Sequence, residues 1–400
     1  MKYLVLIGNG LTDQPIAEKN NKTPLQLADT PNLDRLVGSG HAGTLETIPE
    51  NLHAGNDVSY LSLLGMDPVH YHAAPASFLA RALGIQIQEG EVPLCCDFVI
   101  LQSSHNDMIM KDFTADFLAS EDSKTLLDAL RDQIVDSEVR FHPGGGYNNL
   151  MVLKSPPYAK RLTPPNELVG EGIRRFMPAD DEFKELIFII NQAQIILHNH
   201  PFNQKRRMEN LDPVNSVWLW GNGKPARLPQ FAEIHGKKAS VITPSLIFQG
   251  MAKDAGMNVV SGDKPSNNGA NRFQELVETA FKELDQYDMA YLHFADPEAY
   301  SLKGQIDEKI FAIEDFDQEV VGPVMEIANS RGDIKILVLV NHVCSVNSMK
   351  YEKGRVPFLM YPAKRPSKRF ERFDESIMEA DLDHFKKGPD LIGAFLKDQW

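Results

Sequence analysis

The residues best placed to do chemistry stand where apolar runs end. The first such run, Leu4–Ile7, stops at Gly8-Asn9-Gly10. A buried parallel strand that meets a turn has this pattern, and α/β folds bind their ligands at the carboxyl ends of such strands. Enzymes that hold a metal there usually carry a carboxylate, whereas this chain carries the neutral amide of Asn9. Asn9 is therefore a ligand, a turn former or the trace of a lost ligand.

A second strand-like run, Ile334–Val340, ends at Asn341-His342. A lone histidine after a strand is more often a hydrogen-bonded core residue than a ligand, and we favour that interpretation for His342. Carboxylates elsewhere in the chain are candidate ligands for a rearranged metal site. The candidates are Asp13, Asp57, Asp296 and Glu298.

Alternating strand-like and helical segments from about residue 239 onward predict a mainly parallel sheet flanked by helices, which is an α/β fold. The strand-like runs are Tyr3–Gly8, Phe98–Leu101, Leu150–Leu153, Ala239–Thr243, Met257–Val260, Met289–Phe294 and Ile334–Val340. The helical patterns are Pro31–Ser39, Ser123–Gln133, Ser245–Asp254, Arg272–Glu283 and Ile306–Asn329. Thr30 is predicted to cap the first of these helices, because Pro31 suits its first position.

The segment from about Asp67 to Phe231 differs from the rest of the chain. It is richer in proline, glycine and loops, and Arg174-Arg175 and Lys205–Arg207 add local positive charge. This change predicts a second, smaller domain inserted into the first.

Charge and cysteine content exclude several classes of protein. The formal net charge of −14 disfavours nonspecific binding to nucleic acid or to anionic membranes. The three cysteines, Cys95, Cys96 and Cys344, match neither a disulfide framework nor a zinc spacing, which favours a reducing compartment. No apolar stretch approaches the length of a membrane span. We therefore expect a cytoplasmic protein that binds neither nucleic acid nor membranes.

Several stretches in one order resemble the archaeal-type cofactor-independent phosphoglycerate mutases of the alkaline phosphatase superfamily. They include "LVLIGNGLTDQP", "AGNDVSYLSLLGMDP", "PVNSVWLWGNGKPARLPQF", "AIEDFDQEVVGP" and "ILVLVNH". The resemblance implies a phosphatase-like metal-site domain over residues 1–66 plus 233–400. It implies a smaller inserted α+β substrate-binding domain over residues 67–232. In active relatives a serine and two divalent ions, typically manganese, interconvert 3-phosphoglycerate and 2-phosphoglycerate in glycolysis.

The resemblance also assigns seven site positions. Asn56 stands at the position of the serine nucleophile, and an amide cannot accept a phosphoryl group as an alkoxide does. The other six are family metal-ligand positions, of which only the histidine is unchanged and one acid replaces another: Asn9, Glu298, Leu302, Asn341, His342 and Tyr351. Divalent cations need carboxylate oxygens, so this concerted change predicts the loss of both metals.

Part of the substrate side is changed as well. Pro75 and Cys95 replace family arginines, and Phe117 replaces a family histidine. Guanidinium groups clamp phosphate and carboxylate, so these changes weaken the expected affinity for phosphoglycerate. The retained substrate-binding positions, which could still meet an anion, are Asn203, Arg206 and Asn215.

These positions together predict a mutase homologue that is catalytically inactive and has a binding or regulatory role. We expect no cofactor and consider a small anionic metabolite as a ligand, with any protein partner left open. The alternative is an active mutase, or a related metal-dependent phosphotransferase or phosphatase. It would use a rearranged site with two divalent ions, manganese or zinc.

Overall fold

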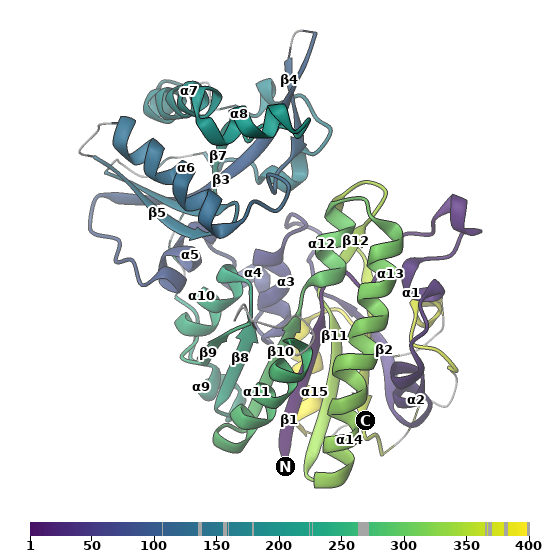
Figure 1. The fold of residues 1–400 in the computed structure, drawn as a ribbon. Helices are drawn as coiled ribbons and strands as arrows, with labels where there is room; N and C mark the ends of the chain where they lie inside the picture. The colour runs from purple at the N-terminus through teal and green to yellow at the C-terminus, as the bar shows by residue number, and fades with distance from the viewer. Residues whose placement is uncertain are drawn as a thin grey trace. The chain divides into compact units, whose positions relative to one another are not determined.

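The computed structural model describes residues 1–397 except 106, 135–137, 155–157, 159, 178–179, 224, 226, 263–271, 365, 367–369 and 380–382. The chain forms two compact units (Figure 1). Unit 1 comprises residues 1–72 and 227–400, and unit 2 comprises residues 73–226. Each of these boundaries lies six residues inside the sequence-based boundaries at 66/67 and 232/233.

The predicted α/β architecture is confirmed in unit 1, whose eight-stranded sheet has the order β15-β2-β14-β11-β1-β10-β8-β9. The strands are β1 (Lys2–Gly8), β2 (His41–Glu46), β8 (Ala239–Thr243), β9 (Asn258–Ser261), β10 (Met289–Phe294), β11 (Ile334–Val340), β14 (Arg355–Tyr361) and β15 (His384–Phe385). The strands from β11 to β9 run parallel to one another, while β14 is antiparallel to both its neighbours. A separate two-stranded sheet joins β12 (Val343–Ser345) to β13 (Lys350–Glu352).

The register of the three central strands places the site. Gly8 of β1 is opposite Phe294 of β10 on one side and Val340 of β11 on the other. Because the three strands are parallel and end at the same level, the residues that follow them leave the sheet at one edge. Those residues include Asn9 and Asn341, which the sequence places 332 positions apart but the sheet brings together.

Helices cover the sheet of unit 1, and Figure 1 shows α11, α13 and α14 lying along one face of it. The helices of this unit are α1 (Pro24–Leu27), α2 (Pro31–Ser39), α3 (Asn56–Leu63), α4 (Pro68–Tyr71), α9 (Phe231–His235), α10 (Leu246–Asp254), α11 (Arg272–Gln286), α12 (Asp296–Leu302), α13 (Ile306–Asp315), α14 (Gly322–Arg331) and α15 (Gly388–Lys397). A π-helical segment, Phe316–Val321, joins α13 to α14. Among the described residues no helix is both long and apolar enough to cross a membrane.

The predicted start of α2 is confirmed, with Thr30 at the N-cap and Pro31 at the first position, but the predicted capping by the Thr30 side chain is not observed. The Thr30 side chain makes no capping hydrogen bond to the helix backbone. The carboxylate of Asp317, in the π-helical segment, instead accepts from the backbone N–H groups of Asn32 (3.1 Å) and Leu33 (2.7 Å). The first-turn donors of α2 are thus satisfied by a residue far along the chain.

Unit 2 is built on an antiparallel sheet with the order β4-β3-β6-β5, and β7 pairs with the long strand β3. Its strands are β3 (Glu91–Ser104), β4 (Asp107–Asp112), β5 (Val139–Gly145), β6 (Asn148–Lys154) and β7 (Ser216–Trp220). Its helices are α5 (Pro75–Leu83), α6 (Ser120–Gln133), α7 (Lys184–Asn199) and α8 (Pro201–Met208). Helices α6 and α7 bury Leu127, Leu130 and Ile189 in one apolar cluster with strand residues such as Phe98.

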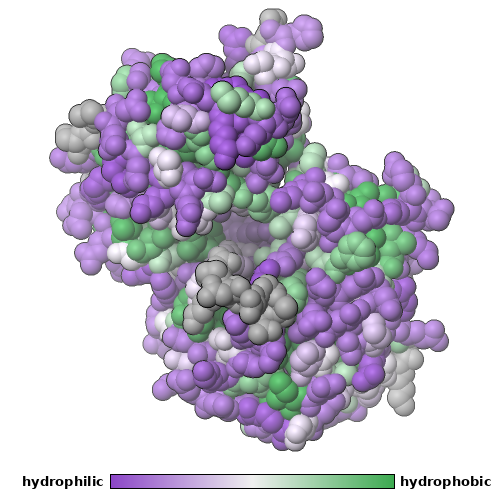
Figure 2. All heavy atoms as spheres, in the orientation of Figure 1, coloured by the Kyte–Doolittle hydropathy of each residue, from purple (hydrophilic) through white to green (hydrophobic). Residues whose placement is uncertain are grey.

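The face of the molecule in Figure 2 is mainly hydrophilic, with smaller apolar patches between the polar areas. This agrees with the composition of the chain, of which 24% are charged residues.

Candidate functional site

One carboxylate, that of Glu298 on α12, lies at the centre of the predicted metal-ligand positions. Its residue is only 8% exposed. Each carboxylate oxygen accepts two hydrogen bonds from side chains at those positions. The donors to Oε1 are Asn56 Nδ2 (2.8 Å) and Tyr351 Oη (3.1 Å), and those to Oε2 are Asn341 Nδ2 (3.0 Å) and Asn9 Nδ2 (3.1 Å). These five residues and His342 are called the Glu298 cluster below.

The amides of the cluster face Glu298 with their nitrogen atoms, since an amide oxygen turned toward the carboxylate would repel it. Burial is the largest influence on Glu298 and raises its pKa. The four side-chain donors act in the opposite direction, because they stabilise the charged form. The pKa of Glu298 still lies above its ordinary value, so neutral donors only partly offset the loss of water.

Asn9 is not the turn former. The left-handed residue after β1 is Gly10, with φ of +75°. A Cβ atom on Gly10 would also lie 2.6 Å from the backbone N and Cα of Glu298, so α12 approaches closely only because residue 10 is glycine. Asn9 instead directs its amide nitrogen at Glu298 and at the Tyr60 hydroxyl (2.9 Å). The side chain of Asn9 therefore serves the cluster, while Gly10 makes the turn.

Asn341 links the cluster to the end of β1. Its Oδ1 accepts from the backbone N–H of Gly10 at 3.1 Å, and its Nδ2 donates to Asn56 Oδ1 at 2.9 Å. Next to it, His342 is fully buried, and its Nδ1 lies 3.1 Å from the carbonyl oxygen of Val343. Burial lowers the pKa of His342 to about 4, so the ring is neutral at pH 7. A neutral ring beside a carbonyl carries its proton on Nδ1, as a hydrogen-bonded core histidine does.

The remaining two positions differ in their role. The Tyr351 ring packs on His342 with 4.5 Å between ring centroids, while its hydroxyl reaches Glu298. Leu302, at the end of α12, is 8% exposed and supplies no polar group. The structure thus assembles six of the seven predicted positions into one hydrogen-bonded network, with Leu302 as the apolar exception.

The three predicted substrate-binding residues lie in unit 2, and each has partners within its own unit. Asn203 donates to the carbonyls of Leu197 (2.8 Å) and Val214 (2.7 Å). Asn215 exchanges two hydrogen bonds with the backbone of Leu101. The Arg206 Nε donates to the carbonyl of Asp212 (2.7 Å), and one of its terminal nitrogens lies 3.3 Å from an Asp116 carboxylate oxygen. Their binding of an anion stays a prediction.

The four carboxylates considered for a rearranged metal site do not converge. The Asp13 carboxylate forms a buried ion pair with Lys309 (2.7 Å), and Asp296 pairs with both terminal nitrogens of Arg272 (2.8 and 3.1 Å). Glu298 is held in its own cluster. Asp57 lies between two histidines, so each carboxylate has a separate set of partners.

The two histidines beside Asp57 were not predicted from the sequence. His53 Nε2 is 2.9 Å from Asp57 Oδ1, and His72 Nε2 is 2.8 Å from Asp57 Oδ2. Burial alone would raise the pKa of Asp57, but the two imidazoles outweigh it and hold that pKa far below its usual range. The spacing of His53 and Asp57, four residues apart, was the available signal. His72 offered none, because it lies beyond α3 and a further helix.

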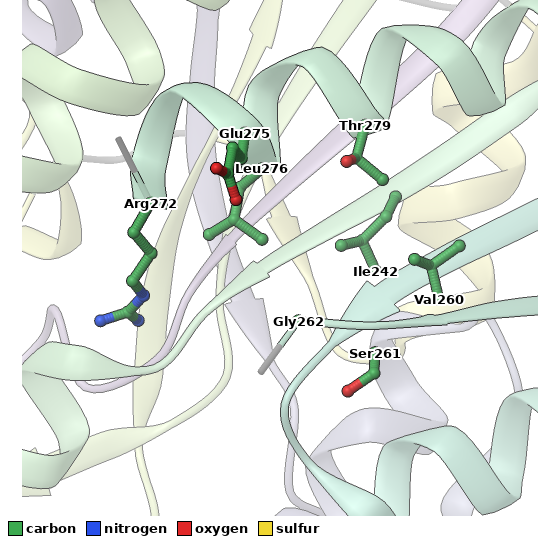
Figure 3. A pocket seen from close by; sticks show the side chains of 8 residues that line it. All are labelled: Ile242, Val260, Ser261, Gly262, Arg272, Glu275, Leu276 and Thr279. Atoms are coloured by element: carbon green, nitrogen blue, oxygen red, sulfur yellow. The ribbon is translucent and has the colours of Figure 1, made fainter. Parts of the chain in front are cut away.

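A small pocket lies between the ends of β8 and β9 and the start of α11 (Figure 3). The polar side chains that line this pocket are those of Ser261, Arg272, Glu275 and Thr279. Its volume of about 40 Å³ accommodates a few water molecules rather than a metabolite. It does not include any of the predicted site residues.

Comparison with known proteins decides the family. A sequence model described as 2,3-bisphosphoglycerate-independent phosphoglycerate mutase matches residues 38–203. The protein of that name from Methanothrix thermoacetophila is 34% identical over 395 residues, covering 98% of each chain. The one from Methanosarcina mazei is 31% identical over 400 residues, covering 99% of this chain and all of the relative. This chain belongs to the 2,3-bisphosphoglycerate-independent phosphoglycerate mutase family.

Solved structures support the fold of a phosphoglycerate mutase of this family. A Pyrococcus horikoshii protein superposes with a TM-score of 0.74 at 22% identity, covering 99% of this chain and 96% of that one. The cofactor-independent phosphoglycerate mutase from Thermoplasma acidophilum gives a TM-score of 0.54 at 23% identity, covering 99% and 98%. At these identities the likeness concerns the fold alone.

The expectation that this mutase homologue takes no cofactor is wrong. This expectation rested only on the seven aligned positions. Membership of the family instead implies two divalent ions. The described residues also contain a group of three ligand-type side chains outside those positions, His53, Asp57 and His72, whose ligand atoms all lie within 4.8 Å of one another. The Glu298 cluster itself does not fit two divalent ions, because donors rather than acceptors face its carboxylate.

Proposed function

We propose that this member of the phosphoglycerate mutase family does not run the phosphoserine reaction at the Glu298 cluster, and that it acts by binding a small anionic metabolite in a regulatory role. The observation that carries the proposal is the set of four donors around Glu298. In a two-metal phosphoryl transfer, acceptor atoms hold cations that offset the charge of the phosphoryl group. Here amides and a phenol stand in place of those acceptor atoms, and they donate hydrogen bonds to Glu298.

The chemistry of Asn56 supports the same proposal. This residue begins α3 and stands at the position of the family nucleophile. Its Nδ2 is hydrogen-bonded to Glu298 and its Oδ1 accepts from Asn341. An amide in this arrangement has no alkoxide to form, and a buried carboxylate 2.8 Å away would repel an incoming phosphoryl group.

A mutase assay with purified protein tests the loss of the reaction. With 3-phosphoglycerate and added Mn²⁺ or Zn²⁺, we expect no formation of 2-phosphoglycerate above a protein-free blank, and no phosphorylated protein by mass spectrometry. A stepwise restored variant is the control: Asn9→Asp, Asn56→Ser and Asn341→Asp, followed by Leu302→His and Tyr351→His. Turnover by the unmodified chain would overturn the proposal and favour an active mutase with a rearranged site.

The binding role is tested separately by thermal unfolding with 3-phosphoglycerate. A ligand that binds only the folded state raises the midpoint in proportion to the logarithm of its concentration. We expect such a rise for the unmodified chain and a smaller one for Arg206→Gln. A midpoint that stays constant up to millimolar ligand would remove phosphoglycerate from the candidate metabolites.

A further inference from the structure

A second group of polar side chains in unit 1 lies outside the Glu298 cluster. His53 is in the loop before α3, Asp57 is the second residue of α3, and His72 follows α4. Their side chains are 13%, 5% and 10% exposed. All three groups are thus largely withdrawn from water but still reachable from it.

The ligand atoms of this group converge on one point. Each oxygen of Asp57 faces the Nε2 atom of a different imidazole, at 2.9 Å for His53 and 2.8 Å for His72. The two rings are nearly perpendicular, with an interplanar angle of 68° and 5.4 Å between centroids. Two imidazole nitrogens and a carboxylate aimed at one another from different parts of the chain resemble a metal-ligand set.

Gly55 shows that the space around these atoms is kept clear. Its φ of −173° is extended backbone that any residue adopts, so conformation does not require glycine there. Glycine is required at this position for steric reasons, because a Cβ atom on residue 55 would lie 2.5 Å from Asp57 Oδ1 and 2.9 Å from His53 Nε2. A side chain at this position would intrude directly between the converging groups.

We propose that His53, Asp57 and His72 bind one divalent transition-metal ion of the zinc type. Imidazole nitrogen suits zinc, whereas magnesium and calcium select oxygen ligands. Zinc bound at about 2.0–2.2 Å to each ligand sets neighbouring ligand atoms roughly 3.3 Å apart. The two contacts between Nε2 and the Asp57 oxygens need to widen by a few tenths of an ångström, all the ligand atoms already lie within 4.8 Å of one another, and water completes a tetrahedral site.

The chemistry of binding is an exchange of protons for the ion. Hydrogen bonds between Nε2 and the Asp57 oxygens require protons on those nitrogens, and the ion takes their place as each ring moves its proton to Nδ1 or releases it. The inference does not depend on the proposed function, since none of the three ligands belongs to the Glu298 cluster.

Calorimetric titration of the chelator-treated full chain with Zn²⁺ tests the site. We expect one equivalent to bind, and His53→Gln or His72→Gln to weaken binding at least about tenfold. The control is His70→Gln, which removes an exposed histidine from the neighbouring helix α4. The site is refuted if no zinc binds, or if the His53 and His72 variants bind as tightly as the His70 variant does.

Two further variants keep the test decisive. Gly55→Ala leaves all three ligands in place but introduces the clashing Cβ, so it should also weaken zinc binding while the near-ultraviolet circular dichroism of the fold is retained. Glu298→Gln should bind zinc like the unmodified chain. Loss of zinc in Glu298→Gln with retention in the histidine variants would move the ion to the Glu298 cluster and overturn the assignment.

Discussion

Asp57 and Glu298 are both nearly buried carboxylates of unit 1, yet their pKa values are shifted in opposite directions. The pKa of Asp57 lies far below its usual range, because two imidazoles outweigh the effect of burial. The pKa of Glu298 remains raised although four neutral donors surround it. Groups that can carry positive charge thus compensate a buried carboxylate, whereas amide and phenol dipoles do so only in part.

The largest effect is expected at a third buried carboxylate, Asp13, which is paired with the charged side chain of Lys309. The Asp13 and Lys309 side chains are 1% and 0% exposed. Lys309→Met leaves the Asp13 charge buried without its counter-ion, so we expect a loss of about 3–5 kcal/mol in the free energy of unfolding, measured by urea denaturation.

The matched control for that variant is Lys19→Met. The Lys19–Asp307 pair has the same 2.7 Å distance but is 36% and 69% exposed. Its removal should cost less than about 1 kcal/mol. Equal losses for the two variants would show that charge compensation in the interior is not what separates the two kinds of carboxylate.

Asp97 extends the comparison to unit 2, where a buried carboxylate again accepts from neutral donors, among them Trp220 Nε1 (2.6 Å), Asn148 Nδ2 (3.2 Å) and the backbone of Asn149. Burial raises its pKa to about 7. Between about pH 4 and pH 7 the folded state therefore holds a proton that the unfolded state has released, and stability falls as the pH rises. The loss across this window is about 3 kcal/mol.

The measurement is the free energy of unfolding at pH 5 and pH 8 for the unmodified chain and for Asp97→Asn. The readout is the difference between the two proteins, because buried histidines with lowered pKa values, such as His293 and His342, titrate in an overlapping range with the opposite sign. We expect a smaller decline for Asp97→Asn. The same pH dependence in both proteins would contradict the raised pKa.

A smaller effect is expected within the Glu298 cluster. Asn9→Asp replaces a donor by a carboxylate that faces Glu298 Oε2, where the nitrogen is now 3.1 Å away. We expect a loss of about 2 kcal/mol, against about 1 kcal/mol for Asn9→Ala, which removes the hydrogen bond without adding charge. If Asn9→Asp proves no worse than Asn9→Ala in chemical denaturation, like-charge repulsion does not govern this cluster.

The seven strand-like runs were predictable because their signals are local, whereas β2 and β14 of the unit 1 sheet were not among the predicted runs. All seven strand-like runs are strands, and Gly8-Asn9-Gly10 does mark the end of the central one. The roles of single side chains were less accessible. Asp317 caps α2 and His72 meets Asp57 through tertiary packing, and no spacing in the sequence indicates either contact. The left-handed turn belongs to Gly10 rather than Asn9, a distinction that composition alone does not make.

The position of β1 has a consequence for protein synthesis. This strand leaves the ribosome well before its two neighbours, β10 and β11, which end at Phe294 and Val340. This largely buried strand must therefore remain without its two partners while unit 2 is translated in full. Residues 73–226 are one continuous stretch that forms its own contacts. The nascent chain therefore completes unit 2 before it has synthesised the strands that complete the sheet of unit 1.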